Sequence, residues 1–127
     1  MKVLQLPPGM RVDTTRSGIR FQGTAPALRA LSASLRPLAS SPDHTIWRVP
    51  VRGDSPWKLV SQEQYPVLHR RFTVIMPPDA WAVIVWKLLH VSSGLEGPSF
   101  QFAECGYLRP APNVDVAIDL LGDPEPL

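Results

Sequence analysis

The densest apolar run of this 127-residue chain lies between Arg70 and Val91 and holds two of its four tryptophans. The first part of the run, residues 72–76, is rich in aromatic and β-branched side chains, which favour a strand. Pro77 and Pro78 follow, and a helix cannot continue across such a pair. The run is therefore predicted to supply the core of the fold.

The residues after these prolines allow two interpretations. Residues 83–85 are three consecutive β-branched residues, which favour a strand and are costly in a helix. Residues 72–76 and 80–92 would then form a β-hairpin. In the alternative interpretation residues 80–92 form a helix, with Asp79 as its N-cap and Gly94 at its end. The β-branched residues favour the hairpin, which is the prediction, and the helix over residues 80–92 stays open as the alternative.

The most regular alternation of apolar and polar positions covers residues 114–121. Asp115 and Asp119 stand between apolar residues there, which is typical of a half-buried strand with its carboxylates facing water or a basic partner. Shorter runs of the same kind predict further strands. These are residues 19–22, 44–51, 57–60 and 99–108.

One helix is predicted, over residues 25–36. Thr24 is a suitable N-cap, and Pro26 is tolerated in a first helical turn. Leucines recur at helical spacing within the segment and form one apolar stripe, which the sheet would cover. Pro37 is expected to end this helix.

Fifteen residues are proline, about twice the usual share, and they are scattered rather than gathered in one linker. The predicted fold class is mainly β: a small antiparallel sandwich or partly closed barrel with one short helix and extended termini. Residues 1–17 are interpreted as an extended N-terminal arm, residues 18–121 as a single β-rich domain, and residues 122–127 as an acidic C-terminal tail. The start of the sequence resembles neither a signal peptide nor a membrane span, and no membrane partner is expected.

The net charge of +2 hides an uneven distribution. Residues 1–71 carry eleven Lys and Arg against four Asp and Glu, whereas residues 72–127 carry two against seven. Opposite charge on the two halves predicts contacts between copies of the chain, unless the halves interleave within one fold. The predicted intersubunit contacts are Arg11, Arg16, Arg20, Arg48, Arg52, Asp115, Asp119, Asp123 and Glu125.

Motifs of enzyme chemistry are absent from the sequence. His44, His69 and His90 lack the spacing of metal ligands, and no serine lies in a nucleophile motif. There is no glycine-rich phosphate loop. Cys105 is the single cysteine, which excludes a disulfide within the chain. The sequence therefore predicts a protein without catalytic residues, metal or cofactor.

These features together predict a structural subunit of a larger assembly, which binds copies of itself or other proteins. A viral capsid cement, decoration or connector protein, located in the virion, is one concrete form of this role. A first alternative is a small-ligand-binding or catalytic β-barrel. Its pocket would be lined by Trp81, Trp86, Phe100 and Tyr107, with His90 or Glu104 as the polar group. A second alternative is binding of nucleic acid through arginine, which outnumbers lysine, although no nucleic-acid-binding motif occurs.

Overall fold

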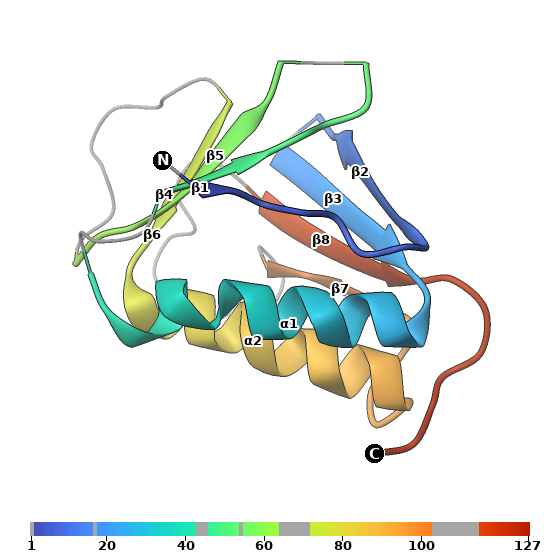
Figure 1. Cartoon of the computed structure of the whole chain (residues 1–127). Helices are drawn as coiled ribbons and strands as arrows, with labels where there is room; N and C mark the ends of the chain where they lie inside the picture. The colour runs from blue at the N-terminus through green and yellow to red at the C-terminus, as the bar shows by residue number, and fades with distance from the viewer. Residues whose placement is uncertain (1, 17, 43–45, 54, 64–71, 103–114) are drawn as a thin grey trace.

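The computed structural model of the chain contains two four-stranded sheets and two helices in the residues that it describes (Figure 1). These residues are 2–16, 18–42, 46–53, 55–63, 72–102 and 115–127. The first sheet has the strand order β1 (Lys2–Val3), β4 (Ile46–Val49), β5 (Trp57–Ser61) and β6 (Thr73–Met76). The second sheet has the order β2 (Met10–Thr14), β3 (Gly18–Gly23), β8 (Asp115–Leu120) and β7 (Ser99–Gln101). The helices are α1 (Ala25–Ser40) and α2 (Pro78–Ser93).

Both sheets are mixed. In the first sheet β4 and β5 are antiparallel, while β1 and β6 run parallel to their neighbours. In the second sheet the central strands β3 and β8 are parallel, and β2 and β7 pair with them in antiparallel fashion. Parallel neighbours need a long connection. α1 lies in sequence between β1 and β4, and both helices lie between β3 and β8, whereas most of the connection between β5 and β6 lies outside the described residues.

The two helices lie side by side across the bottom of Figure 1, with both sheets above them. α1 contacts β3 and β5, and α2 contacts β7 and β8, so the helical layer joins the two sheets. One core fills the space between these layers. It includes fully buried side chains from both helices and both sheets, among them Leu31, Ile84, Phe21 and Leu59.

The predicted hairpin over residues 72–92 is wrong, because residues 78–93 form α2. Burial explains the difference. Trp81, Leu88 and Val91 are spaced by one or two helical turns and are fully buried, and each such burial stabilises by about 1.5–3 kcal/mol. The β-branched residues 83–85 cost a helix only about 0.5 kcal/mol each. Tertiary packing therefore outweighs local propensity.

The predicted fold class is confirmed only in part. Strands make up much of the fold, and some neighbours are antiparallel, but the described sheets are mixed and do not close into a barrel. The predicted strands at residues 19–22, 57–60, 72–76 and 114–121 correspond to β3, β5, β6 and β8. Residues 44–45 and 103–108, which belong to two further predicted strands, lie outside the described residues.

The helix predicted over residues 25–36 is confirmed at its start but not at its end. Thr24 caps it, with its side-chain oxygen accepting from the Ala27 N–H at 3.4 Å. α1 then continues through Pro37 to Ser40. The last turn is stabilised because Leu38 is fully buried and its carbonyl accepts a hydrogen bond of 2.7 Å from the buried Ser61 hydroxyl of β5.

The N-terminal residues, interpreted from the sequence as an extended arm, form strands that pair with the rest of the fold. β1 joins the first sheet beside β4, and β2 joins the second sheet beside β3. Leu4 and Val12 are buried in the core. The domain boundaries at residues 17 and 122 stay a prediction. Neither of the described helices is both long and apolar enough to cross a membrane.

Candidate functional site

The clearest candidate site is the side of α2 that faces away from the core. Its members recur every three or four residues, as a helical face requires. Trp86 and Asp79 are exposed on this side, and the residues around them are half-buried. We call this surface the outer face of α2, and it consists of Asp79, Ala82, Val83, Trp86, Leu89 and His90. Val83 lies at its margin, since it is half-buried and also packs against the core.

Trp86 is the dominant side chain of this face. It is 62% exposed, whereas Trp81, on the opposite side of the same helix, is fully buried. Within the described part of the chain Trp86 is the only aromatic residue among the exposed large apolar side chains, the others being Val3, Leu95 and Leu127. An indole ring exposed to this degree leaves a large apolar surface in contact with water in the isolated chain.

The ring of Trp86 is held in place by His90, one helical turn later. The two rings meet edge to face, with centroids 5.4 Å apart and planes at 84°. This arrangement suits aromatic rings because the edge of one meets the face of the other. The contact restricts the side-chain rotamers of Trp86, so that its orientation is largely set before any partner arrives.

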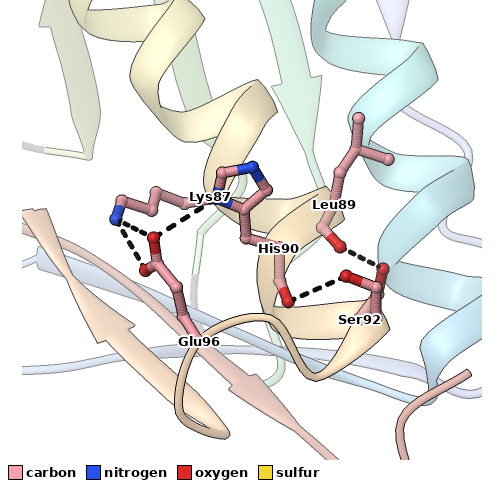
Figure 2. A network of polar contacts seen from close by, with 6 residues as sticks. Lys87, Leu89, His90, Ser92 and Glu96 are labelled. Atoms are coloured by element: carbon pink, nitrogen blue, oxygen red, sulfur yellow. Dashed lines mark hydrogen bonds and ion pairs between the residues drawn. The ribbon is translucent and has the colours of Figure 1, made fainter. Parts of the chain in front are cut away.

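His90 is held in turn by the loop that follows the helix (Figure 2). Gly94 adopts the left-handed conformation, with φ of 78°, and reverses the chain at the end of α2. The reversal brings the Glu96 carboxylate back to the helix, where Oε1 lies 3.2 Å from Nδ1 of His90. Lys87 Nζ donates to both carboxylate oxygens at 2.6 Å.

Lys87 and Glu96 form an ion pair within this network. The hydrogen bond from Lys87, and after it the one from His90, lowers the pKa of the Glu96 carboxyl below its ordinary value of 4.5. Glu96 is therefore ionised at neutral pH. The Lys87 ammonium also lies 5.4 Å from the centre of the Phe100 ring. The network thus orients side chains beside Trp86 and pairs the Lys87 ammonium with the Glu96 carboxylate.

The network does not resemble a catalytic centre. Lys87, His90 and Glu96 bond to one another on an open surface. The Ser93 hydroxyl donates to the backbone carbonyl of His90 at 3.2 Å, and none of the hydrogen bonds between described residues joins a hydroxyl or thiol to these three side chains. Within the described residues no three His, Cys, Asp or Glu side chains cluster as metal ligands would. What this arrangement can do is present a fixed aromatic ring between polar groups.

The intersubunit residues predicted from charge are partly brought together, but within one chain. Arg11 and Arg20 lie on the outer side of the second sheet, in register with Gln22, Asp119 and their neighbours. Nε of Arg20 lies 3.2 Å from Asp119 Oδ2, although it lacks the alignment of a hydrogen bond. Gln22 connects Arg11 to Asp119, since its side chain accepts from Arg11 at 3.1 Å and donates to Asp119 at 3.2 Å.

The other predicted contacts are dispersed. Arg16, Arg48, Arg52 and Asp123 are exposed on different segments, and Asp115 is half-buried in β8. Glu125 lies against the end of α2. Its N–H donates to the Ser92 carbonyl at 2.9 Å, and its carboxylate is 3.6 Å from Arg29 of α1. The basic and acidic halves of the sequence therefore interleave in this fold at Arg20–Asp119 and Arg29–Glu125.

The aromatic pocket considered from the sequence is not assembled from its described members. Trp81 lies in the core and donates from its ring N–H to the Val60 carbonyl at 2.9 Å, while Trp86 faces outward. Phe100 lies under Lys87. The remaining residues proposed for that pocket, Glu104 and Tyr107, lie outside the described residues.

An open groove of about 430 Å³ lies elsewhere, beside the edge of β2. It forms where β2 and residues 50–52 come together, and the Arg52 N–H donates to the Val12 carbonyl at 3.0 Å. The walls are mostly apolar, with Arg11 and Arg52 as the charged members. The residues that line the groove are Leu6, Met10, Arg11, Val12, Pro50, Val51 and Arg52.

Comparison of the chain with protein-family models, with curated proteins and with solved structures finds no match. The function is therefore argued from the geometry of the chain. Sequence reasoning missed the outer face of α2 because it favoured a strand there. The spacing of Asp79, Val83, Trp86 and His90 at three or four residues, followed by Gly94, was the signal that could have found it.

Proposed function

We propose that the protein is a non-enzymatic subunit of a larger protein assembly, and that it docks through the outer face of α2 with Trp86 as the anchor. The observation that carries this proposal is the 62% exposure of Trp86 in the middle of a mainly apolar helix face. An exposed apolar patch of this kind is typical of a surface that contacts another protein. A bound partner protein would remove the apolar surface around Trp86 from water.

The surroundings of Trp86 support the same role. Tryptophan is enriched among the residues that dominate binding energy, and such residues are typically surrounded by a polar rim. Ala82 and Val83 extend the apolar surface along the helix, and Asp79, Lys87 and Glu96 supply polar groups around it. Because His90 already fixes the ring of Trp86, binding would lose little side-chain entropy.

The more specific role expected from the sequence, a viral cement, decoration or connector protein, is one form of this proposal. It needs the same docking surface, because a subunit of a particle must bind its neighbours through a preformed face. Arginine residues that are exposed outside the intrachain pairs, such as Arg48 and Arg52, would then lie at the margin of the contacts.

The test is the native mass of the chain as it occurs in its own source. We expect the 14.1 kDa chain to be recovered in a larger complex at a fixed stoichiometry. The Trp86→Ala variant should remain folded by circular dichroism but be lost from the complex. Trp86→Phe should be retained in part, since it keeps an aromatic anchor.

The matched control is Val3→Ala, because Val3 is also well exposed, at 55%, but lies on β1. It should leave the complex intact. Recovery of the chain solely as a monomer would refute the proposed function, and so would a complex that tolerates Trp86→Ala as well as it tolerates Val3→Ala.

A further inference from the structure

We propose that the partner of the outer face of α2 is a second copy of this chain, and that the two α2 helices pack antiparallel about a two-fold axis. This inference rests on the proposed function and adds the identity and the orientation of the partner. The order of side chains along the helix carries it. Asp79 stands at one end of the face and His90 at the other, with Trp86 and two small apolar residues between them.

An axis that crosses α2 between Ile84 and Val85 makes this order self-complementary. It brings Asp79 opposite His90 of the second copy, and it brings Val83 opposite Trp86 of the second copy. Because the axis is two-fold, both contacts occur twice. A parallel arrangement would instead place Asp79 beside Asp79, and like charges at such a distance repel one another.

The side-chain volumes fit the same arrangement. Ala82 and Val83 are small, and they lie one turn before the large ring of Trp86. In the antiparallel pair each indole ring rests on these small residues of the other copy, so the two rings do not collide. Interdigitation of large and small side chains is the usual way in which two helices approach closely.

The polar groups at the two ends are available for the contact. The carboxylate of Asp79 is exposed, and none of the hydrogen bonds or ion pairs of the described residues involves it. His90 uses Nδ1 towards Glu96, while its other ring nitrogen points away from that carboxylate (Figure 2). Because the Glu96 carboxylate can only accept, Nδ1 carries a proton, and the second nitrogen donates to Asp79 of the second copy when the imidazole is protonated. Antiparallel packing also sets the N-terminus of each helix dipole beside the C-terminus of the other.

The contact is small. The face extends over the twelve residues from Asp79 to His90, whose ends are roughly 16 Å apart at 1.5 Å of rise per residue. A single helix pair of this length buries less than the roughly 1,200 Å² of a standard interface, so we expect a dissociation constant on the order of micromolar to tens of micromolar. Association should therefore depend visibly on protein concentration.

Sedimentation equilibrium of the full chain, from about 1 µM to about 1 mM, tests the inference. We expect the wild type to dimerise, and Trp86→Ala to weaken the dimer at least about tenfold. Asp79→Lys and His90→Glu should each weaken it too, because the first removes the acceptor that faces His90 and the second sets two carboxylates opposite one another, in each case twice. A one-to-one mixture of these two variants should recover the wild-type affinity to within about threefold. In the mixed dimer the introduced lysine faces the introduced glutamate, and the native Asp79 faces the native His90.

Circular dichroism and the melting temperature of each variant show that it is folded. His90→Gln separates the loss of the Glu96 contact from the effect of charge, and it should weaken the dimer less than His90→Glu does. If Trp86→Ala weakens the dimer but the mixture fails to recover, the antiparallel orientation is overturned while the proposed function stands. If the wild-type protein stays monomeric up to about 1 mM, the inference that the partner is a second copy of this chain is overturned. The native-mass experiment then decides the proposed function separately.

Discussion

Substitution of Gly94 by alanine perturbs the turn on which the candidate site depends. Gly94 has a φ of 78° and ends α2. A Cβ added there would lie 3.1 Å from both Cβ and Cγ of Pro124, closer than ordinary van der Waals contact. The change therefore combines a backbone cost with a steric one, and it acts beside the loop that carries Glu96.

The two costs can be separated in magnitude. A left-handed conformation costs an L-residue roughly 1–2 kcal/mol, and alanine recovers about 0.4–1 kcal/mol of this by restricting the unfolded chain. The net backbone cost is thus about 1 kcal/mol. Pro124 cannot move away freely, because the N–H of the next residue, Glu125, donates to the Ser92 carbonyl at 2.9 Å. Overpacking of this kind adds about 1–2 kcal/mol, so the expected total is about 2–3 kcal/mol.

Urea unfolding followed by circular dichroism measures this loss, and the chain offers two matched controls. Gly53 and Gly122 have φ values of 72° and 81°, but an added Cβ would meet nothing within 4 Å at either position. Gly53→Ala and Gly122→Ala should each cost about 1 kcal/mol.

In the presence of Pro124→Ala, the additional cost of Gly94→Ala should fall to the level of these controls. If Gly94→Ala destabilises no more than the two controls do, the steric part of the reasoning is refuted. If Pro124→Ala does not reduce its cost, the assignment of that cost to Pro124 fails.

Alanine substitution of the two tryptophans of α2 should lower the free energy of unfolding by different amounts. Trp81→Ala should cost about 3–5 kcal/mol in urea unfolding, because its ring is fully buried. Trp86→Ala should cost about 1 kcal/mol, because most of its ring is exposed. Equal losses would contradict the assigned faces. Since Lys87 lowers the pKa of Glu96 below 4.5, Glu96 stabilises the fold above that pH, and its contribution is lost as the pH falls through the lowered value. Glu96→Gln should therefore cost up to about 1 kcal/mol at neutral pH and less in acid, and a pH-independent difference in unfolding free energy would refute this. Ser61→Ala removes the hydrogen bond to the last turn of α1 and should cost about 1–3 kcal/mol in the same assay, while an unchanged midpoint would show that water replaces the hydroxyl.

Local signals in the sequence determined several elements of the fold. The alternation around Val116 and Ile118 predicted β8, and both side chains are fully buried in it. Thr24 predicted the start of α1, which it caps. These predictions hold because each depends on residues a few positions apart, and the chemistry of capping and of strand alternation acts within that range.

The candidate site was less accessible from the sequence. Gly94 and the helical spacing of Trp86 and His90 were visible, but residues 83–85 favoured a strand, and the interpretation followed them. Whether Trp86 was buried or exposed could not follow from its neighbours in sequence. It depended on which side of α2 would face the core.

Only the tertiary structure decided how these elements combine. β3 and β8 are parallel neighbours although both helices and, in the described part of the chain, four strands (β4 to β7) lie between them in sequence. No local pattern encodes such a pairing. Burial of Trp81 and Leu88 against the sheets made residues 78–93 a helix, and burial of Leu38 carried α1 past Pro37. Local propensities amount to a few tenths of a kcal/mol per residue, whereas a buried large side chain stabilises by about 1.5–3 kcal/mol. Sequence alone thus determined which segments could form elements, and long-range burial determined which elements they became and which face of α2 was left for a partner.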